Sequence, residues 1–197
     1  PSFGCAIITR TLQAYGYSCA ILPQPDWHND EEFTQFGEPR LGFLVSAGNI
    51  DSMVNHYSVN KRRRDKDSYS DEGVMGKRPD RPTIVYTQIL KRLFPHKPVL
   101  IGGIEASLRR LSHYDYWDDK VRRSILIDSQ ADLLMYGMGE NTIIEVADAL
   151  NSGLRAEDLC YIRGTCWKTK ALEYLSDYVL LPSYEEVCAD KHTYAKS

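Results

Sequence analysis

The sequence predicts an α/β fold built on a three-layer, doubly wound and mostly parallel sheet. Short apolar runs at 41–45, 99–101 and 133–136 carry the prediction, because they lack the polar alternation of strands that face water. Segments with helical spacing separate these runs, and strand–helix alternation is typical of parallel sheets. Right-handed crossovers would place helices on both faces of such a sheet.

The N-terminal segment is expected to form a helix and then a strand. Apolar residues recur at helical spacing from Phe3 to Tyr15, and Gly16 is a natural helix stop. The apolar run 18–22, closed by Pro23, predicts a strand. Because a strand precedes each helix in an alternating fold, we expect either a further strand upstream or a sheet that begins at its second strand.

The next unit consists of a strand at 41–45 and a short helix over 51–57. Residues 60–82 are polar and basic, which predicts a long loop that is functional or disordered. Thr83 is expected to cap a helix that runs to Phe94.

The following unit begins with the strand at 99–101. A polar and aromatic stretch occupies 105–119, and a helix is expected over 120–127. The strand at 133–136 precedes a helix over 141–150, which Gly153 would stop.

The pattern changes after about residue 155. The runs 161–165 and 178–181 are expected to form a hairpin, and Ser183 with Glu186 forms a capping box for a last helix. We therefore predict an α/β domain over 1–154 and, over 155–197, a small hairpin-plus-helix extension that connects to further chain.

Composition limits the possible classes of protein. The chain has 197 residues, of which 43% are hydrophobic and 26% charged, as in globular proteins. Apolar runs stay far below the roughly 18 residues of a membrane helix, so no membrane partner is expected. The five cysteines have irregular spacing without a CxxC, which predicts small buried hydrophobes in a reducing cytoplasm.

Charge is unevenly distributed along the chain. Residues 61–123 hold sixteen Lys and Arg against nine Asp and Glu, while the remainder is acidic. A basic middle segment indicates an anionic partner or, alternatively, a solvated loop and helix surfaces.

Three predicted strands end in small residues, at 46–48, 102–103 and 137–139. Carboxyl ends of neighbouring parallel strands meet at one edge, where ligands bind, and glycine permits close approach. The stretch 105–117 adds charged and aromatic side chains suited to anions, flat ligands or a domain interface. The predicted cleft or interface residues are Ser46, Gly48, Gly102, Gly103, Glu105, Ser107, Arg109, Arg110, His113, Tyr114, Asp115, Tyr116, Trp117, Gly137, Gly139 and Glu140.

Known catalytic motifs are absent from the sequence. It contains no GxGxxG, GxxxxGK[ST], GxSxG, HExxH or paired CxxC. His113 near Asp115 is interpreted as a structural pair. We therefore expect no catalytic residue and no metal ligand within this chain.

Several long motifs resemble the YgiQ group of radical SAM proteins. They are GGIEASLRR at 102–110, HYDYW at 113–117, VRRSIL at 121–126, GKRPDRP at 76–82, YGMGE at 136–140 and LPSYEE at 181–186. The resemblance covers almost the whole chain and implies an N-terminal region of the cobalamin-binding or flavodoxin-like type. It also implies a radical SAM barrel downstream, with a [4Fe–4S] cluster and S-adenosylmethionine.

Two departures from family patterns restrict the cofactors. The CxxxCxxC cluster motif is absent, so no cofactor is expected within this chain. The cobalamin motif DxHxxG is incomplete, because Asp26 and His28 match while Glu31 stands in place of glycine. This argues against cobalamin held through a histidine.

The leading hypothesis is an accessory domain of a radical SAM enzyme of unknown reaction, which helps form the substrate cleft and is not itself catalytic. The alternative is a phosphate- or nucleic-acid-binding module without catalysis. Its cations would be the 61–66 loop, Lys77, Arg78, Arg109 and Arg110. A third hypothesis is a scaffold whose aromatic stretch is only a domain interface.

Overall fold

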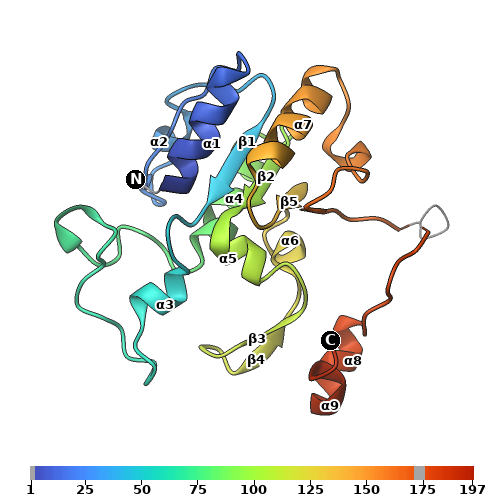
Figure 1. The fold of residues 1–197 in the computed structure, drawn as a ribbon. Coiled ribbons are helices and arrows are strands. Elements are labelled where there is room, and N and C mark those ends of the chain that lie inside the picture. The colour runs from blue at the N-terminus through green and yellow to red at the C-terminus, as the bar shows by residue number, and fades with distance from the viewer. Residues whose placement is uncertain (1–2, 171–175) are drawn as a thin grey trace.

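The computed structural model describes residues 3–170 and 176–197, and it shows an α/β fold (Figure 1). The main sheet has the order β1-β2-β5-β6. β1, β2 and β5 are parallel, and β6 pairs antiparallel with β5. Its strands are β1 (Phe43–Ser46), β2 (Val99–Gly102), β5 (Leu133–Met135) and β6 (Thr165–Cys166).

Helices pack on both faces of this sheet. Successive residues of a strand point to opposite faces, so each face has its own apolar cluster. Val99 and Ile101 pack with α4 (Pro82–Leu93) in one apolar cluster. Leu100 faces the other way and packs with α7 (Glu140–Asn151). α1 (Phe3–Ala14) adds Leu12 to this second layer, against α7.

Most predicted elements are confirmed, with shifts at their ends. The parallel strands, the helices at 3–14 and 140–151 and the long loop before α4 lie where the sequence predicted them. The strand order shows no reversal among the described strands, so the doubly wound arrangement stays a prediction. The remaining elements are α2 (Asp30–Thr34), α3 (Ser52–His56), α5 (Gly103–Leu108), α6 (Ile125–Asp128), α8 (Tyr184–Ala189), α9 (Lys191–Tyr194) and 3₁₀ turns at Asp71–Gly73 and Ala156–Asp158.

The strand predicted at 18–22 is wrong, because this segment forms no ladder. Its apolar residues serve two different layers: Cys19 packs beside α1 and α7, and Leu22 packs beside α4. The segment therefore passes around the edge of the sheet as irregular chain. It is apolar because its residues pack against both layers.

The helix predicted over 120–127 is also wrong in its first half. Residues 120–122 form β4 (Lys120–Arg122), which pairs antiparallel with β3 (His113–Asp115). Asp119 adopts a left-handed conformation (φ 54°) that reverses the chain between the two strands. Helical structure begins only at Ile125, after the Ser124 cap.

The predicted C-terminal hairpin does not form. Residues 165–166 pair with β5 instead, and 178–181 are exposed and irregular. The Ser183 capping box is confirmed at the start of α8. Thr83 is not the cap of α4: Arg81 holds the N-cap position and Pro82 opens the helix.

The cysteines and the apolar helices bear on the predictions from composition. Cys19 and Cys166 are half-buried and pack against apolar clusters, whereas Cys160 and Cys188 are exposed, so the interpretation as buried hydrophobes is wrong for the last two. Within the described ranges, no helix is long and apolar enough to cross a bilayer.

Candidate functional site

The carboxyl ends of β1, β2 and β5 lie side by side, as the sequence predicted. Ser46 stands opposite Gly102 in the β1–β2 register. A Cβ built on Gly103 (φ +80°) would lie 2.5 Å from the Ser46 hydroxyl, so no other residue fits there unstrained. The Gly137 amide donates to the Ser107 hydroxyl at 3.2 Å, which ties the end of β5 to α5. We call this surface the glycine edge; it comprises Ser46, Gly48, Gly102, Gly103, Ser107, Gly137 and Gly139.

Glu105 is fully buried beneath this edge and joins three elements. Its Oε2 accepts from the Ser52 amide at 3.0 Å and the Ser52 hydroxyl at 2.7 Å, at the start of α3. Its Oε1 accepts from the Thr83 amide at 3.2 Å, in the first turn of α4. Glu105 therefore satisfies helix amides that no backbone carbonyl reaches, and this is a structural role.

A buried ion pair between Asp51 and Arg109 lies beside Glu105. Asp51 also accepts from the amides of Met53 and Val54, so one carboxylate caps α3 and binds the guanidinium. Burial lowers the pKa of Arg109 from its ordinary value, with the nearby charge of Asp115 opposing that shift. Arg109 is thus committed within the protein and is not free for a ligand.

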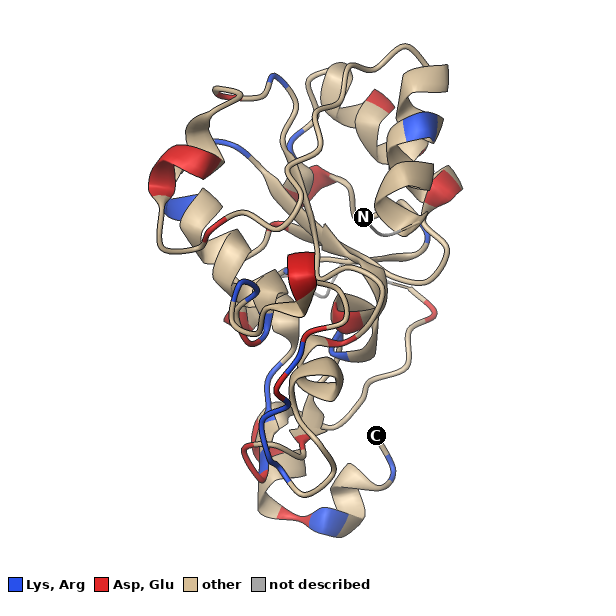
Figure 2. Cartoon of the chain, turned by 90° about the vertical axis from the view of Figure 1, so that its left-hand side faces the viewer, with Lys and Arg blue, Asp and Glu red and all other residues tan. Residues whose placement is uncertain are grey.

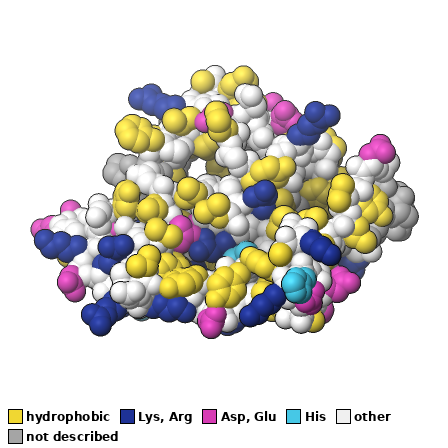
Figure 3. Space-filling view, turned by 60° about the horizontal axis from the view of Figure 1, so that its bottom comes forward, with side chains coloured by type: hydrophobic (Ala, Val, Ile, Leu, Met, Phe, Trp, Pro, Cys, Tyr) yellow, Lys and Arg dark blue, Asp and Glu magenta, His cyan; other side chains and the backbone are white. Residues whose placement is uncertain are grey.

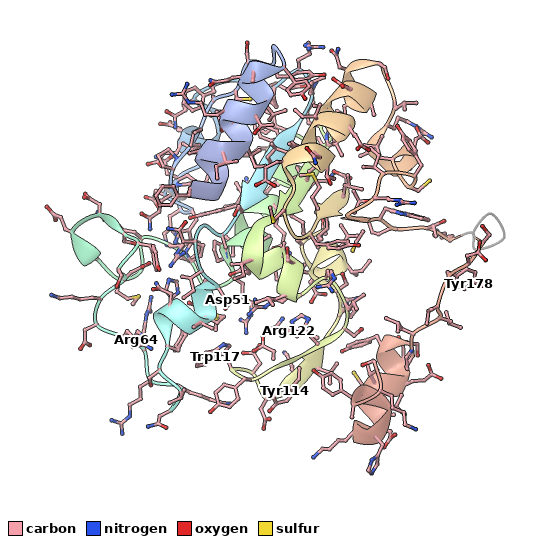
Figure 4. All side chains as sticks on the ribbon, viewed as in Figure 1. Asp51, Arg64, Tyr114, Trp117, Arg122 and Tyr178 are labelled. Atoms are coloured by element: carbon pink, nitrogen blue, oxygen red, sulfur yellow. The ribbon has the colours of Figure 1, made fainter. Side chains whose placement is uncertain are left out.

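The β3–β4 hairpin is clamped through Asp115. Its Oδ2 lies 2.6 Å from Arg81 Nη2 and 2.8 Å from Arg122 Nε, and its Oδ1 accepts from the Trp117 amide at 3.0 Å. Burial opposes ionisation of Asp115, but the Arg81 hydrogen bond and charge outweigh it and lower the pKa. Figure 4 labels Asp51, Trp117 and Arg122 and shows them between α3 and the hairpin.

The aromatic residues of the hairpin contact the neighbouring loop and the C-terminal helices. Tyr116 donates its hydroxyl proton to the Val59 carbonyl at 2.6 Å. The Tyr114 amide donates to the Tyr194 hydroxyl at 2.9 Å. His113 Nδ1 lies 3.1 Å from the Leu111 carbonyl, and burial lowers its pKa. His113 and Asp115 therefore have separate partners and form no dyad.

Arg110 differs from Arg109 because it contacts a carbonyl oxygen and an aromatic ring rather than an acid. Its Nη1 donates to the Ser107 carbonyl at 2.7 Å, and its guanidinium lies 5.1 Å from the Tyr136 ring centre. Gly139, which belongs to the glycine edge, caps α7, and Glu140 next to it is the first residue of that helix. Within the described residues, Arg110 therefore forms no ion pair, in contrast to Arg109.

One buried cluster was missed in the sequence. His56 is fully buried, with Nδ1 2.7 Å from Asp80 Oδ1 and Nε2 3.3 Å from Asp67 Oδ2. Arg78 binds Asp67 at 3.3 Å, and Tyr57 donates to Asp80 at 2.6 Å. His56 and Tyr57 end α3, Asp67 lies within the loop, and Arg78 and Asp80 belong to the GKRPDRP motif, so no single spacing rule joins them. The cluster fixes the ends of the long loop to α3.

Two shallow, open hollows among the described residues lie away from the glycine edge. The larger, about 590 Å³, is at the opposite edge, where Pro98 and Asp132 precede β2 and β5. A second hollow of about 380 Å³ lies between α4, β4 and Tyr184. Gly103 and Gly137 are exposed, so the glycine edge is open to solvent at these positions.

The cofactors implied by the resemblance do not fit this chain. No cluster of three or more metal-binding side chains occurs in the described residues, and the cysteines come from separate segments. His28 is exposed next to α2, and Asp30 binds Arg92 in the last turn of α4. The glycine edge adjoins the first turn of α4, so the incomplete cobalamin motif lies at the wrong end of that helix.

Comparison with known proteins gives a consistent result. A family model described as "Radical SAM N-terminal" matches residues 1–197. A UPF0313 protein of Clostridium perfringens is 54% identical over 99% of this chain, and one of Clostridium botulinum is 52% identical over 100% of it. The chain spans about 30% of the length of each relative. No solved structure matches it. The chain belongs to the radical SAM N-terminal family and is related to the UPF0313 proteins.

Proposed function

We propose that this chain is the N-terminal accessory domain of a radical SAM enzyme and that its glycine edge closes one side of the substrate cleft. The observation that carries the proposal is the alignment of three small-residue strand ends at one open edge. Family membership and relatives about three times longer support a catalytic domain elsewhere in the same polypeptide. Residues 155–197 would form the connector to that domain.

The catalytic cofactors belong to the remainder of the polypeptide in this proposal. A [4Fe–4S] cluster with S-adenosylmethionine supplies radical chemistry when bound there. The residues of this chain would exclude water and hold the substrate, with Arg110 as the anion contact. A sheet with helix layers on both faces is compatible with a cobalamin-type architecture, although the residues do not favour cobalamin itself. A cytoplasmic location is part of this proposal, because the irregular spacing of the cysteines is unlike a disulfide framework.

Exposed apolar side chains surround the glycine edge and indicate where the catalytic domain docks. Met138 is 87% exposed, and Leu108 is 62% exposed. Figure 3 views this side of the molecule and shows hydrophobic side chains across it, with Lys and Arg both among them and at the margins. Contiguous exposed apolar surface is typical of an interface. The edge set comprises Val54, Ile104, Leu108, Leu111, Tyr136 and Met138.

The non-catalytic alternative is weakened in its predicted form. It requires Arg78 and Arg109 as free cations, but Asp67 and Asp51 bind them. Lys77 is exposed and lies 3.6 Å from Asp71, a contact that contributes little. Arg110 and the cations of the 61–66 loop remain, and they are compatible with either hypothesis.

The test uses the full-length protein purified without oxygen. We expect bound iron with the spectrum of a [4Fe–4S] cluster and reductive cleavage of S-adenosylmethionine. The double variant Leu108→Asp with Met138→Asp should increase amide hydrogen exchange at the glycine edge. It should also slow the cleavage of S-adenosylmethionine. Leu154→Asp, an exposed change at the opposite edge, is the control. Lack of a cluster, or equal effects of both variants, would contradict the proposal.

A further inference from the structure

A basic arm projects from the domain beside the β3–β4 hairpin. We define it as residues 57–66, which follow α3 and precede the 3₁₀ turn at Asp71–Gly73. The Ser58 amide donates to the Arg62 carbonyl at 2.8 Å, and the Arg64 amide donates to the His56 carbonyl at 2.8 Å. Tyr57 and Arg63 form an antiparallel bridge. The arm is therefore a hydrogen-bonded, hairpin-like turn.

In the part of the chain that the structure describes, the cations at the end of the arm are not held in ion pairs. The charge of Arg63 does reach Asp80, where it adds to the His56 hydrogen bond in lowering the pKa of that carboxyl. Arg62, Arg63, Arg64 and Lys66 form no ion pair within the described residues, and the arm contains a single acid, Asp65. Figure 2 shows the arm as a blue stretch of loop on the side that faces the viewer.

Arginines elsewhere in the same region behave differently. Arg78, Arg81, Arg109 and Arg122 are each bound to an aspartate. Consecutive unpaired cations repel one another, and an ordered turn that keeps them together favours a polyanionic partner. The contrast separates cations that hold the fold from cations that are available to a ligand.

An aromatic surface adjoins these cations. Tyr116 is 48% exposed, and Lys61 Nζ lies 4.8 Å from its ring centre. The Trp117 ring meets Tyr116 edge-on at 5.3 Å and the Tyr57 ring at 5.6 Å. The Tyr116 hydroxyl donates to the Val59 carbonyl, so the exposed ring is fixed to the arm. An exposed aromatic ring beside cations suits base stacking next to phosphate contacts.

We propose that the basic arm and Tyr116 form a binding site for single-stranded nucleic acid. The arginines would contact successive phosphates, and the Tyr116 ring would stack on an unpaired base. Duplexes are disfavoured because their bases are already stacked. The site goes beyond the accessory role and does not depend on it, since it involves neither the glycine edge nor an iron cluster.

The test measures binding of fluorescent 16-nucleotide single strands, one RNA and one DNA, to the full-length protein. The variant R62Q/R63Q/R64Q should bind at least tenfold more weakly in about 0.1 M salt and lower the salt slope by about 2, because each phosphate contact contributes roughly 0.7. The control K168Q/K191Q/K196Q removes three exposed cations that form no ion pair in the described part. Both variants should keep the wild-type melting temperature.

A second pair of variants separates stacking from charge. Tyr116→Leu should weaken binding about tenfold, whereas Tyr116→Phe keeps the ring and should bind like wild type. Tighter binding of the RNA strand than of the DNA strand identifies RNA as the ligand, and the reverse identifies DNA. Equal weakening by the arm and control triples, competition by polyglutamate as strong as by the unlabelled strand, or no effect of Tyr116→Leu would overturn the proposal. The iron–sulfur cluster content of the full-length protein is measured separately. Lack of the cluster would therefore contradict only the proposed accessory role.

Discussion

Glu105 binds Ser52 twice through one oxygen: the Ser52 amide and hydroxyl both donate to Oε2, at 3.0 and 2.7 Å. The Ser52 hydroxyl in turn accepts from the Arg81 amide at 2.9 Å. A single buried carboxylate thus fixes the starts of α3 and α4 relative to β2, and both the glycine edge and the basic arm depend on that relationship.

Glu105→Ala should destabilise the domain by about 3 kcal/mol, since it leaves buried amide and hydroxyl donors without an acceptor. Glu105→Gln retains acceptor oxygen and should cost less. Glu145→Ala, on the exposed face of α7, is the control and should change little. Hydrogen exchange of residues 52–57 in the full-length protein measures the effect, and unchanged exchange in Glu105→Ala would refute the role assigned to this carboxylate.

Glu105 illustrates which parts of the candidate site could be predicted from the sequence and which could not. Small residues after apolar runs predicted that Ser46, Gly102 and Gly137 meet at one edge, because the period of buried strands and the geometry of parallel pairing are local rules. The same stretch predicted Glu105 and Arg109 as cleft residues. Their actual partners, Ser52 and Asp51, lie more than fifty positions earlier, and no local pattern pairs them.

The errors have a similar cause. Residues 18–22 have strand-like composition, but their apolar side chains serve two packing layers. Residues 120–122 follow a turn that depends on the left-handed Asp119 and on the Asp115 clamp. The His56 cluster assembles residues of α3 and the following loop at irregular spacing. In each case, contacts between residues far apart in the sequence determined the structure. The periodicity of a short segment gives no information about such contacts.

Gly103→Ala should lower the melting temperature by roughly 4–10 °C, because an alanine at φ +80° is strained and its Cβ would overlap the Ser46 hydroxyl. Gly139→Ala is the matched control, since a Cβ there meets nothing within 4 Å and its φ of −88° suits any residue. Ser46→Gly added to Gly103→Ala should restore part of the loss, by removing the overlap but not the strain. Thermal unfolding of the three variants gives their melting temperatures. Equal melting temperatures for Gly103→Ala and Gly139→Ala would contradict the close packing of Gly103 against Ser46.

Acid should release the hairpin through Asp115. Its pKa is lowered in the folded state because the Arg81 hydrogen bond and charge outweigh burial. A carboxyl group with a lowered folded pKa stabilises the fold above its unfolded pKa of about 3.9, and this contribution is lost as pH falls through the folded value. Melting temperatures measured between pH 6 and 3 should therefore fall more steeply in the wild type than in Asp115→Asn. Asp65→Asn, at an exposed carboxylate without an ion pair in the described part, should keep the wild-type slope.

The tyrosines of the C-terminal helices attach residues 184–194 to the hairpin. The Tyr194 hydroxyl accepts from the Tyr114 amide at 2.9 Å, and the Tyr184 hydroxyl reaches the Val121 carbonyl at 3.5 Å. Tyr194→Phe removes the shorter bond, so α9 should detach more often and protease should cleave within 176–183 several times faster. Tyr184→Phe removes only the longer and weaker contact and should have a smaller effect, because hydrogen bonds weaken with distance. A time course of limited proteolysis of the full-length protein compares the two variants. Equal cleavage of wild type and Tyr194→Phe would show that the tail is held by other contacts, such as Val187, which is buried on α8.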